Sequence, residues 1–110
     1  MKHTVGKVVE IGAGKEEDVT IYTVPAGKRF KVTKIIVAFP TGQAFALEVY
    51  LKYGIQQVVP DEGVLVGDGH SYAFEEEWEY DSGTDIKLHG KNTDTANAQK
   101  VFVLLEGELI

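Results

Sequence analysis

Tyr22–Val32, with the sequence Tyr-Thr-Val-Pro-Ala-Gly-Lys-Arg-Phe-Lys-Val, places a turn between two strand-like segments. The residues on both sides of the turn are rich in β-branched and aromatic side chains, which favour strands. Pro25 restricts the backbone at the start of the turn, and Gly27 can adopt the positive φ that many turns require. The segment therefore predicts that the chain reverses here, with a strand on each side.

The rest of the sequence repeats this pattern of short apolar runs separated by Gly, Pro, Asp and Asn. No stretch has the apolar period of an amphipathic helix, and eight or nine strands with regular turns are typical of a sandwich or barrel. We therefore expect an all-β fold, an antiparallel two-sheet sandwich of the jelly-roll type, formed by residues 1–110 as one domain. The expected strands are 4–11, 19–24, 30–39, 44–53, 55–59, 71–80, 85–91 and 100–108, with a short apolar segment at 64–66, a flexible acidic loop at 12–18 and a polar loop with Asx-type capping at 92–99.

Three details of the apolar pattern carry further expectations. The alternation in the third strand shifts by one residue at Thr33-Lys34, which predicts a β-bulge or a strand that passes between sheets. Strict alternation in 44–53 points Phe45 and every second residue after it toward the core. Val101–Leu105 is apolar on both faces, which indicates a central strand or one that a partner covers.

The composition excludes several classes of partner. The chain has 17 acidic and 11 basic residues, a net charge of −6, and its basic residues are scattered. Nucleic acids and anionic membranes bind clustered Lys and Arg, so we expect neither as a partner. The absence of cysteine excludes disulfides and thiolate sites. Met1–Gly6 lacks the apolar segment of a signal peptide, which predicts a cytoplasmic location at synthesis.

The segment Ser71–Tyr80 alternates aromatic residues with glutamates. The alternation places Tyr72, Trp78 and Tyr80 on one face of a strand and most of the glutamates on the other. In one interpretation the aromatic side chains fill the core, as they do in many small β-proteins. In the other they form an exposed ladder that stacks on sugar rings or on a partner protein. Tyr72, Trp78 and Tyr80 are therefore our candidate interface or ligand contacts.

The sequence offers no catalytic constellation, and we expect no catalytic residue, metal or cofactor. The histidines His3, His70 and His89 lack the short spacings of zinc ligands, and neither serine lies in a Gly-x-Ser-x-Gly elbow. Cupins share the predicted architecture, but Gly69-His70-Ser71-Tyr72 lacks the second histidine of the cupin metal motif. A cupin-like metal enzyme built from His70, His89 and a glutamate is therefore the least favoured alternative.

Three segments together resemble those of small jelly-roll proteins of virions. They are the turn Val24–Lys28 leading into Phe30–Val32, the polar strand Thr84–Leu88, and the closing segment Val101–Gly107. The resemblance is to head-decoration, tail or fibre modules of tailed phages and archaeal viruses, and it covers most of the chain as a strand order. It implies a structural protein of the virion that self-associates or attaches to a capsid or tail lattice and needs no catalytic residues.

We therefore predict a non-enzymatic structural or interaction module, a virion component that assembles as a homo-oligomer, with a trimer favoured. The doubly apolar last strand and the many aromatic residues of 72–80 favour assembly, because association would cover apolar surface and sheet edges. The second interpretation is a carbohydrate-binding module that uses the aromatic segment as a platform for a glycan.

Overall fold

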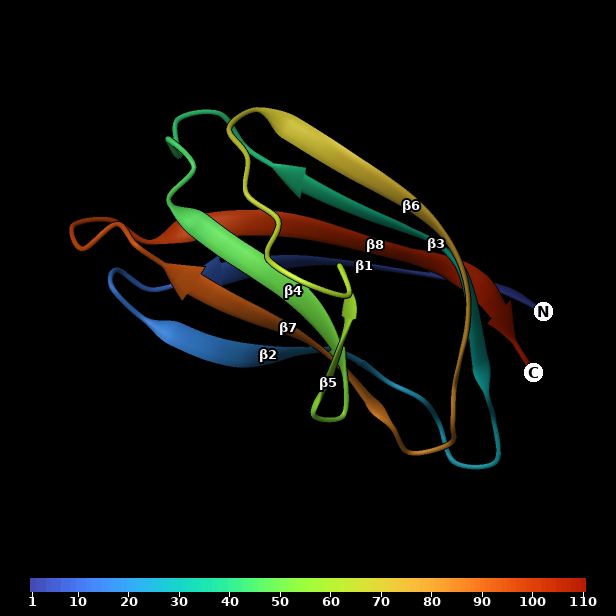
Figure 1. The fold of residues 1–110 in the computed structure, drawn as a ribbon. Helices are drawn as coiled ribbons and strands as arrows, with labels where there is room; N and C mark the ends of the chain where they lie inside the picture. Colours follow the sequence, from blue (N-terminus) through green and yellow to red (C-terminus); the bar gives the residue numbers. More distant parts are fainter.

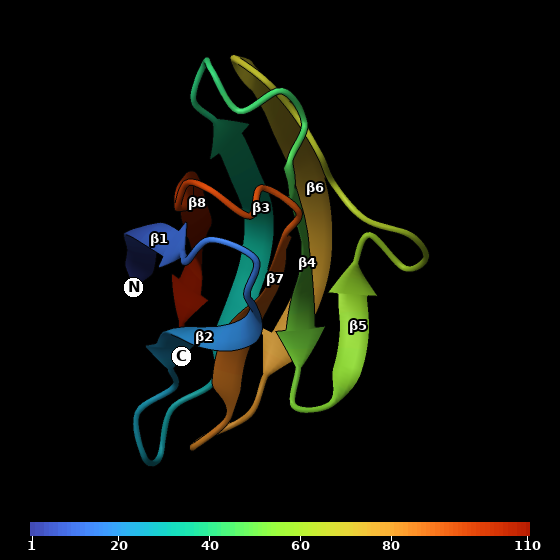
Figure 2. The ribbon, with the colours of Figure 1, turned by 90° about the vertical axis from the view of Figure 1, so that its left-hand side faces the viewer.

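The computed structural model describes all 110 residues as two four-stranded antiparallel sheets that face each other (Figure 1). Its strands are β1 (Lys2–Ile11), β2 (Glu16–Thr23), β3 (Phe30–Phe39), β4 (Leu47–Tyr53), β5 (Gln56–Val59), β6 (His70–Tyr80), β7 (Asp85–Asn92) and β8 (Gln99–Leu109). The first sheet has the order β1-β8-β3-β6 and the second β2-β7-β4-β5, which is the jelly-roll arrangement that the sequence predicts. Figure 2 shows the short β5 at the margin of the second sheet, beside β4. No helix has the length and apolar composition needed to cross a membrane.

The inward faces of the two sheets enclose one hydrophobic core of 21 buried residues. Strand β4 illustrates how the sequence builds it, because Leu47, Val49 and Leu51 are at most 1% exposed. The intervening Glu48 and Lys52 lie on the outward face and are half-buried. Burying one such aliphatic side chain contributes about 1.5–3 kcal/mol, so the two-residue alternation is the main reason for the layered fold.

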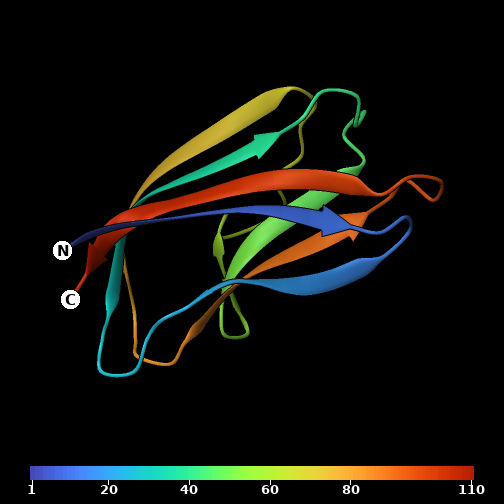
Figure 3. The same cartoon turned by 180° about the vertical axis from the view of Figure 1, so that it is seen from behind.

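The last strand lies in the interior of the first sheet. One edge of β8 pairs with β1 along the whole length of β1, and the other edge pairs with β3. Because β1 and β8 are antiparallel and fully paired, the two termini lie side by side at one end of the sandwich (Figure 3). This position confirms the interpretation of Val101–Leu105 as part of a central strand.

Strand β3 contains the predicted irregularity at Thr33. The register with both neighbouring strands shifts between Val32 and Lys34. Relative to β8, Thr33 is an extra residue, whereas on β6 the two residues Glu76 and Glu77 lie opposite Thr33. At this point Gly107 of β8 lies against the backbone of β3, and a β-carbon on Gly107 would overlap with the carbonyl oxygen of Lys31. The phase shift in the sequence is therefore a β-bulge, and a glycine accommodates it.

The turn after β2 closes as predicted. The amide of Lys28 donates to the carbonyl oxygen of Pro25 at 3.1 Å, and Gly27 has a φ of 77°. The hydroxyl of Ser82, from the turn between β6 and β7, accepts from the Gly27 amide at 2.8 Å and donates to the Pro25 carbonyl oxygen at 3.2 Å. The two turns therefore support each other at this end of the sandwich.

One prediction about the second sheet needs correction, and the expected count of eight or nine strands is resolved. The sequence predicts a flexible loop over 12–18, but β2 already begins at Glu16, because the charged residues at its start pair with β7. The apolar segment 64–66 forms only an isolated bridge between Leu65 and Val49, which leaves eight strands. Side-chain polarity misled the first prediction, since an outward strand face tolerates charged residues.

The prediction that Phe45 points inward is also wrong. Phe45 is 60% exposed and has a φ of 60°, following Ala44 with a φ of 50°, and β4 begins only at Leu47. The carboxylate of Asp68 accepts hydrogen bonds from the amides of Gly42 and Ala44, both at 2.9 Å. These bonds hold the turn in a left-handed conformation that the local alternation does not reveal.

The loop between β7 and β8 is organised by Asn92, which is 2% exposed. Its side-chain amide donates to the carbonyl oxygens of Ile11 at 3.1 Å, Gly12 at 3.3 Å and Asn97 at 2.9 Å. Its side-chain oxygen accepts from the amide of Asp94 at 2.9 Å, which is the Asx-type capping predicted for this loop. One buried side chain thus joins the loop after β7 to the end of β1.

Candidate interaction surface

The outward face of the first sheet carries a continuous apolar surface. Two cross-strand rows form it, because the register aligns Gly6, Leu104, Ile36 and Ala73 in one row and Val8, Phe102, Ala38 and Ser71 in the next. Val8 is 58% exposed and Phe102 is 40% exposed. We call this surface the outer apolar face and define it by these residues: Gly6, Val8, Ile36, Ala38, Ala73, Phe102 and Leu104.

Strand β8 supplies the centre of the outer apolar face because both of its sides are apolar. Val101, Val103 and Leu105 point into the core and are 0% exposed. Phe102 and Leu104 alternate with them and therefore point outward, where nothing in the chain covers Phe102 fully. A sheet face that turns to water is usually polar, so this composition marks a contact surface.

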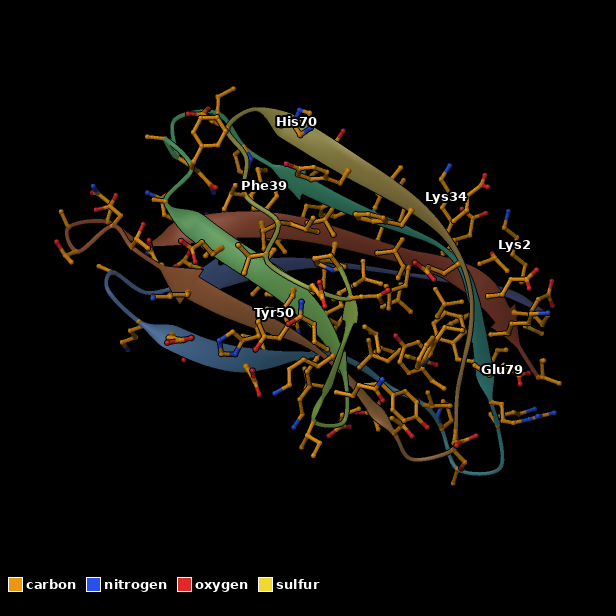
Figure 4. The ribbon with its side chains drawn as sticks, in the orientation of Figure 1. Lys2, Lys34, Phe39, Tyr50, His70 and Glu79 are labelled. Carbon is orange, nitrogen blue, oxygen red and sulfur yellow. The ribbon has the colours of Figure 1, made fainter.

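The outer apolar face ends in charged residues in both strand directions. At one end, Lys100 lies 3.7 Å from the carboxylate of Glu10. At the other end, Lys2 lies 3.0 Å from Glu106. Beside Glu106, a hollow lies around the bulge of β3. Figure 4 shows Lys2 and Lys34 projecting from the first sheet, while Tyr50 lies on β4 of the second sheet. The hollow is lined by Thr33, Lys34, Glu75, Glu76, Glu77 and Glu106.

The three candidate aromatic contacts lie on the inward side of β6. Tyr80 is 1% exposed, and its ring stacks on Tyr53 with 5.1 Å between the centroids. Trp78 is half-buried, with its ring edge-on to Tyr53 at 6.1 Å. Tyr72 is also half-buried and donates a hydrogen bond to the carbonyl oxygen of Val66 at 2.6 Å. Their role as an interface or glycan contact stays a prediction.

The buried end of this aromatic series is kept uncharged. Burial raises the pKa of the Tyr80 hydroxyl far above its usual value, and the nearby negative charge of Glu76 and the neighbouring Tyr53 hydroxyl raise this pKa further. Tyr80 therefore stays protonated and packs as a core residue under all ordinary conditions.

The outward face of the second sheet carries a histidine between two carboxylates. His89 of β7 lies 2.6 Å from Asp18 through Nδ1 and 2.8 Å from Glu16 through Nε2. The ring of Tyr50 on β4 stacks on His89 at a centroid distance of 4.8 Å, and Lys52 donates to Asp18 at 2.9 Å. His89 points outward because it alternates with the buried Leu88 and Gly90, and its carboxylate partners depend on the pairing of β2 with β7.

The carboxylates favour the charged imidazolium. Burial lowers the pKa of His89, but the hydrogen bonds to Glu16 and Asp18 outweigh burial and hold this pKa above its usual value. Burial likewise raises the pKa of Asp18, but hydrogen bonds from Lys52 and His89 outweigh it and hold the pKa below its usual range. The group is therefore a network of ion pairs across three neighbouring strands.

This network predicts a pH-dependent contribution to stability. Because folding raises the pKa of His89, its stabilising contribution is fully present below the unfolded value of 6.5 and is lost as the pH rises through the folded value. We expect the difference in unfolding free energy between the wild type and His89→Gln to be larger at about pH 5.5 than at about pH 8.5. Urea denaturation at both pH values measures it, with His70→Gln as the control. An equal difference at both pH values would contradict the charged network.

His70 and His89 do not share a site. His70 begins β6 in the first sheet, where its ring lies against Tyr72 at 4.6 Å. His89 lies on the outward side of the second sheet, and its hydrogen-bond partners come from β2. The structure therefore does not assemble the cluster of His70, His89 and a glutamate on which a cupin-like enzyme would depend.

No protein-family model matches the sequence, and no curated protein matches it. Solved structures do match the fold. Chains described with the atomic structure of Sulfolobus Turreted Icosahedral Virus, and with the triple jelly-roll fold and turret assembly of an archaeal virus, each align with a TM-score of 0.64 and 14% identity. Each match covers 99% of this chain, which spans 29% of the viral chain.

Two phage structures match over most of both chains. The capsid structure of Helicobacter pylori bacteriophage KHP30 aligns with a TM-score of 0.52 and 15% identity, covering 100% of this chain and 97% of the other. The capsid of cyanophage Pam1 aligns with a TM-score of 0.51 and 11% identity, covering 96% and 83%. The resemblance to jelly-roll proteins of virions that the sequence predicts is therefore confirmed at the level of the fold.

Proposed function

We propose that this protein is a non-enzymatic structural module of a virus particle that self-associates through its outer apolar face. The observation that carries the proposal is the exposed Phe102 at the centre of a continuous apolar sheet surface. Water-facing sheets of monomeric proteins are polar, and apolar patches on them usually mark contacts with other proteins. Assembly requires only a complementary surface, so the proposal assigns no role to catalytic residues.

The viral neighbours support the virion part of the proposal by analogy of fold. Phage KHP30 and cyanophage Pam1 place domains of this fold in capsids, and the archaeal virus uses it in chains more than three times longer. Fold alone does not establish function, so the proposed function rests on the outer apolar face. The trimer that the sequence favours is one of the closed oligomers that this self-association allows.

The proposal predicts that Phe102→Glu abolishes self-association. The substitution places a charge at the centre of the face, where burial against a second molecule would strip it of water. We expect the wild-type mass to rise with concentration in light scattering and the mass of Phe102→Glu to stay that of a single chain. Phe45→Glu is the matched control, because Phe45 is 60% exposed but lies outside the outer apolar face.

Two results would contradict this function. A wild-type mass that stays at one chain over the whole concentration series would exclude self-association. An equal loss of association in Phe45→Glu would show that the outer apolar face is not the contact. Denaturation curves of each variant establish that the fold is retained before the masses are compared.

A further inference from the structure

The outer apolar face is complementary to itself under one two-fold rotation. Along the outward side of β8 the order is Lys100, Phe102, Leu104 and Glu106, a cation and an anion around two large apolar residues. A two-fold axis in the plane of the contact, crossing the strands at Val103, reverses this order in the second copy. Lys100 then lies opposite Glu106 of the second copy, and Phe102 lies opposite Leu104.

The neighbouring strands fit the same operation. On β3, Ile36 and Ala38 pair with Leu104 and Phe102. The rotation therefore places the larger Ile36 opposite the smaller Ala38 of the second copy. On β1, the rotation places Val8 opposite Gly6 of the second copy. Within each copy the ring of Phe102 lies close to Gly6, since a β-carbon on Gly6 would be 3.5 Å from that ring. On the β3 side a large side chain thus meets a small one, and on the β1 side Val8 meets the Phe102 ring that lies beside Gly6.

The glutamate-rich hollow argues against the other two-fold axis. An axis parallel to the strands that ran along β3 would bring the hollow of one copy against the hollow of the other, with four glutamates and one lysine on each side. Each copy also carries a net charge of −6, so such a contact would concentrate repulsion. The axis that crosses the strands keeps the two hollows apart, because it places each hollow opposite the other end of β8, β3 and β6 in the second copy, the end that carries Lys100.

The expected contact is small. Strands spaced about 4.8 Å apart and a rise of about 3.4 Å per residue give the four strands over residues 100–106 an area of about 450 Å² on each copy. A stable interface buries about 800 Å² on each partner. The contact should therefore be weak between two isolated chains and gain strength when many copies associate at once.

We infer that two copies of this chain pair through the outer apolar face about a two-fold axis that crosses the strands, with Lys100 of each copy opposite Glu106 of the other. The inference rests on the proposed function, because it assigns the geometry of the self-association proposed above. It predicts that a dimer is the first species to form as the concentration rises, whereas the sequence analysis favours a trimer, and the measured mass distinguishes the two.

A charge-exchange experiment tests the pairing. Lys100→Glu and Glu106→Lys each place like charges opposite each other twice in the dimer, so each should weaken the dissociation constant about tenfold or more. The double variant restores both pairs and the net charge, and should return the constant to within about threefold of the wild type. Sedimentation equilibrium over a concentration series measures these constants. The matched controls are Lys87→Glu and Glu48→Lys, which make the same charge changes on the second sheet and should have little effect.

The outcomes separate this inference from the proposed function. If Phe102→Glu dissociates the protein but the double charge variant is no stronger than the singles, the two-fold pairing is overturned and self-association through this face stands. A trimer would also overturn the pairing. If Phe102→Glu leaves the mass unchanged, the proposed function itself fails.

Discussion

Replacing Gly107 by alanine is expected to destabilise the protein by about 3 kcal/mol or more, enough to unfold many small domains. A β-carbon at this position would lie 2.8 Å from the carbonyl carbon of Lys31 and 2.9 Å from the α-carbon of Val32. Both contacts are with backbone, which cannot rotate away as a side chain can. The bulge at Thr33 would have to separate from β8, and the core between the two strands would open.

Equilibrium denaturation in urea, followed by tryptophan fluorescence from the single Trp78, measures this effect. Gly6→Ala is the matched control in the same sheet, because its β-carbon would meet nothing closer than a Phe102 ring atom at 3.5 Å. The control should lose little stability at a concentration low enough to keep the chain monomeric. A Gly107→Ala midpoint equal to that of Gly6→Ala would show that β3 and β8 are not packed as described.

Replacing Asn92 by aspartate should cost about 3 kcal/mol or more at neutral pH, although the two side chains have nearly the same shape. The amide of Asn92 donates to three carbonyl oxygens, of Ile11, Gly12 and Asn97. A carboxylate would turn these favourable contacts into repulsion between negative atoms at a site that is 2% exposed. The loop between β7 and β8 would then lose its connection to the end of β1.

This penalty should depend on pH in a direction that identifies its cause. Burial against carbonyl oxygens raises the pKa of the introduced carboxyl in the folded state, so folding favours its protonated form. The difference in stability from the wild type should therefore shrink as the pH falls through that raised pKa. Gln56→Glu makes the same charge change at an exposed position and should have little effect at any pH. A penalty independent of pH would point to a loss of shape rather than to buried charge.

The sequence predicted most of the strands because their apolar residues alternate with the period of a sheet. It placed β3 at Phe30–Phe39 and identified its irregularity, since an odd-numbered shift in the pattern has few structural explanations. It failed at Phe45, where the hydrogen bonds from Gly42 and Ala44 to Asp68 override the local pattern. Asp68 is distant in sequence, so no local rule could include it.

The sequence alone indicated only part of the outer apolar face. The apolar run in β8 indicated a central or covered strand, but its outward side chains belong to a surface only when β1, β3 and β6 supply neighbours in register. The aromatic segment was the more conspicuous signal, yet the structure turns Tyr72, Trp78 and Tyr80 toward the interior. Composition identifies apolar side chains that are more stable when buried, whereas the pairing of the strands decides whether each of them is buried.

The sequence by itself therefore determined the all-β class, the turn at Pro25–Lys28, the presence of an irregularity in β3 and the apolar character of both sides of β8. These features follow from local backbone preferences and from the two-residue period of a strand. Only the tertiary structure decided which residues from distant strands share a surface: the rows across the outer apolar face, the carboxylates on either side of His89, and the carbonyl oxygens around Asn92. Each of these depends on strand pairing and register, which long-range packing of the core fixes and no local segment encodes.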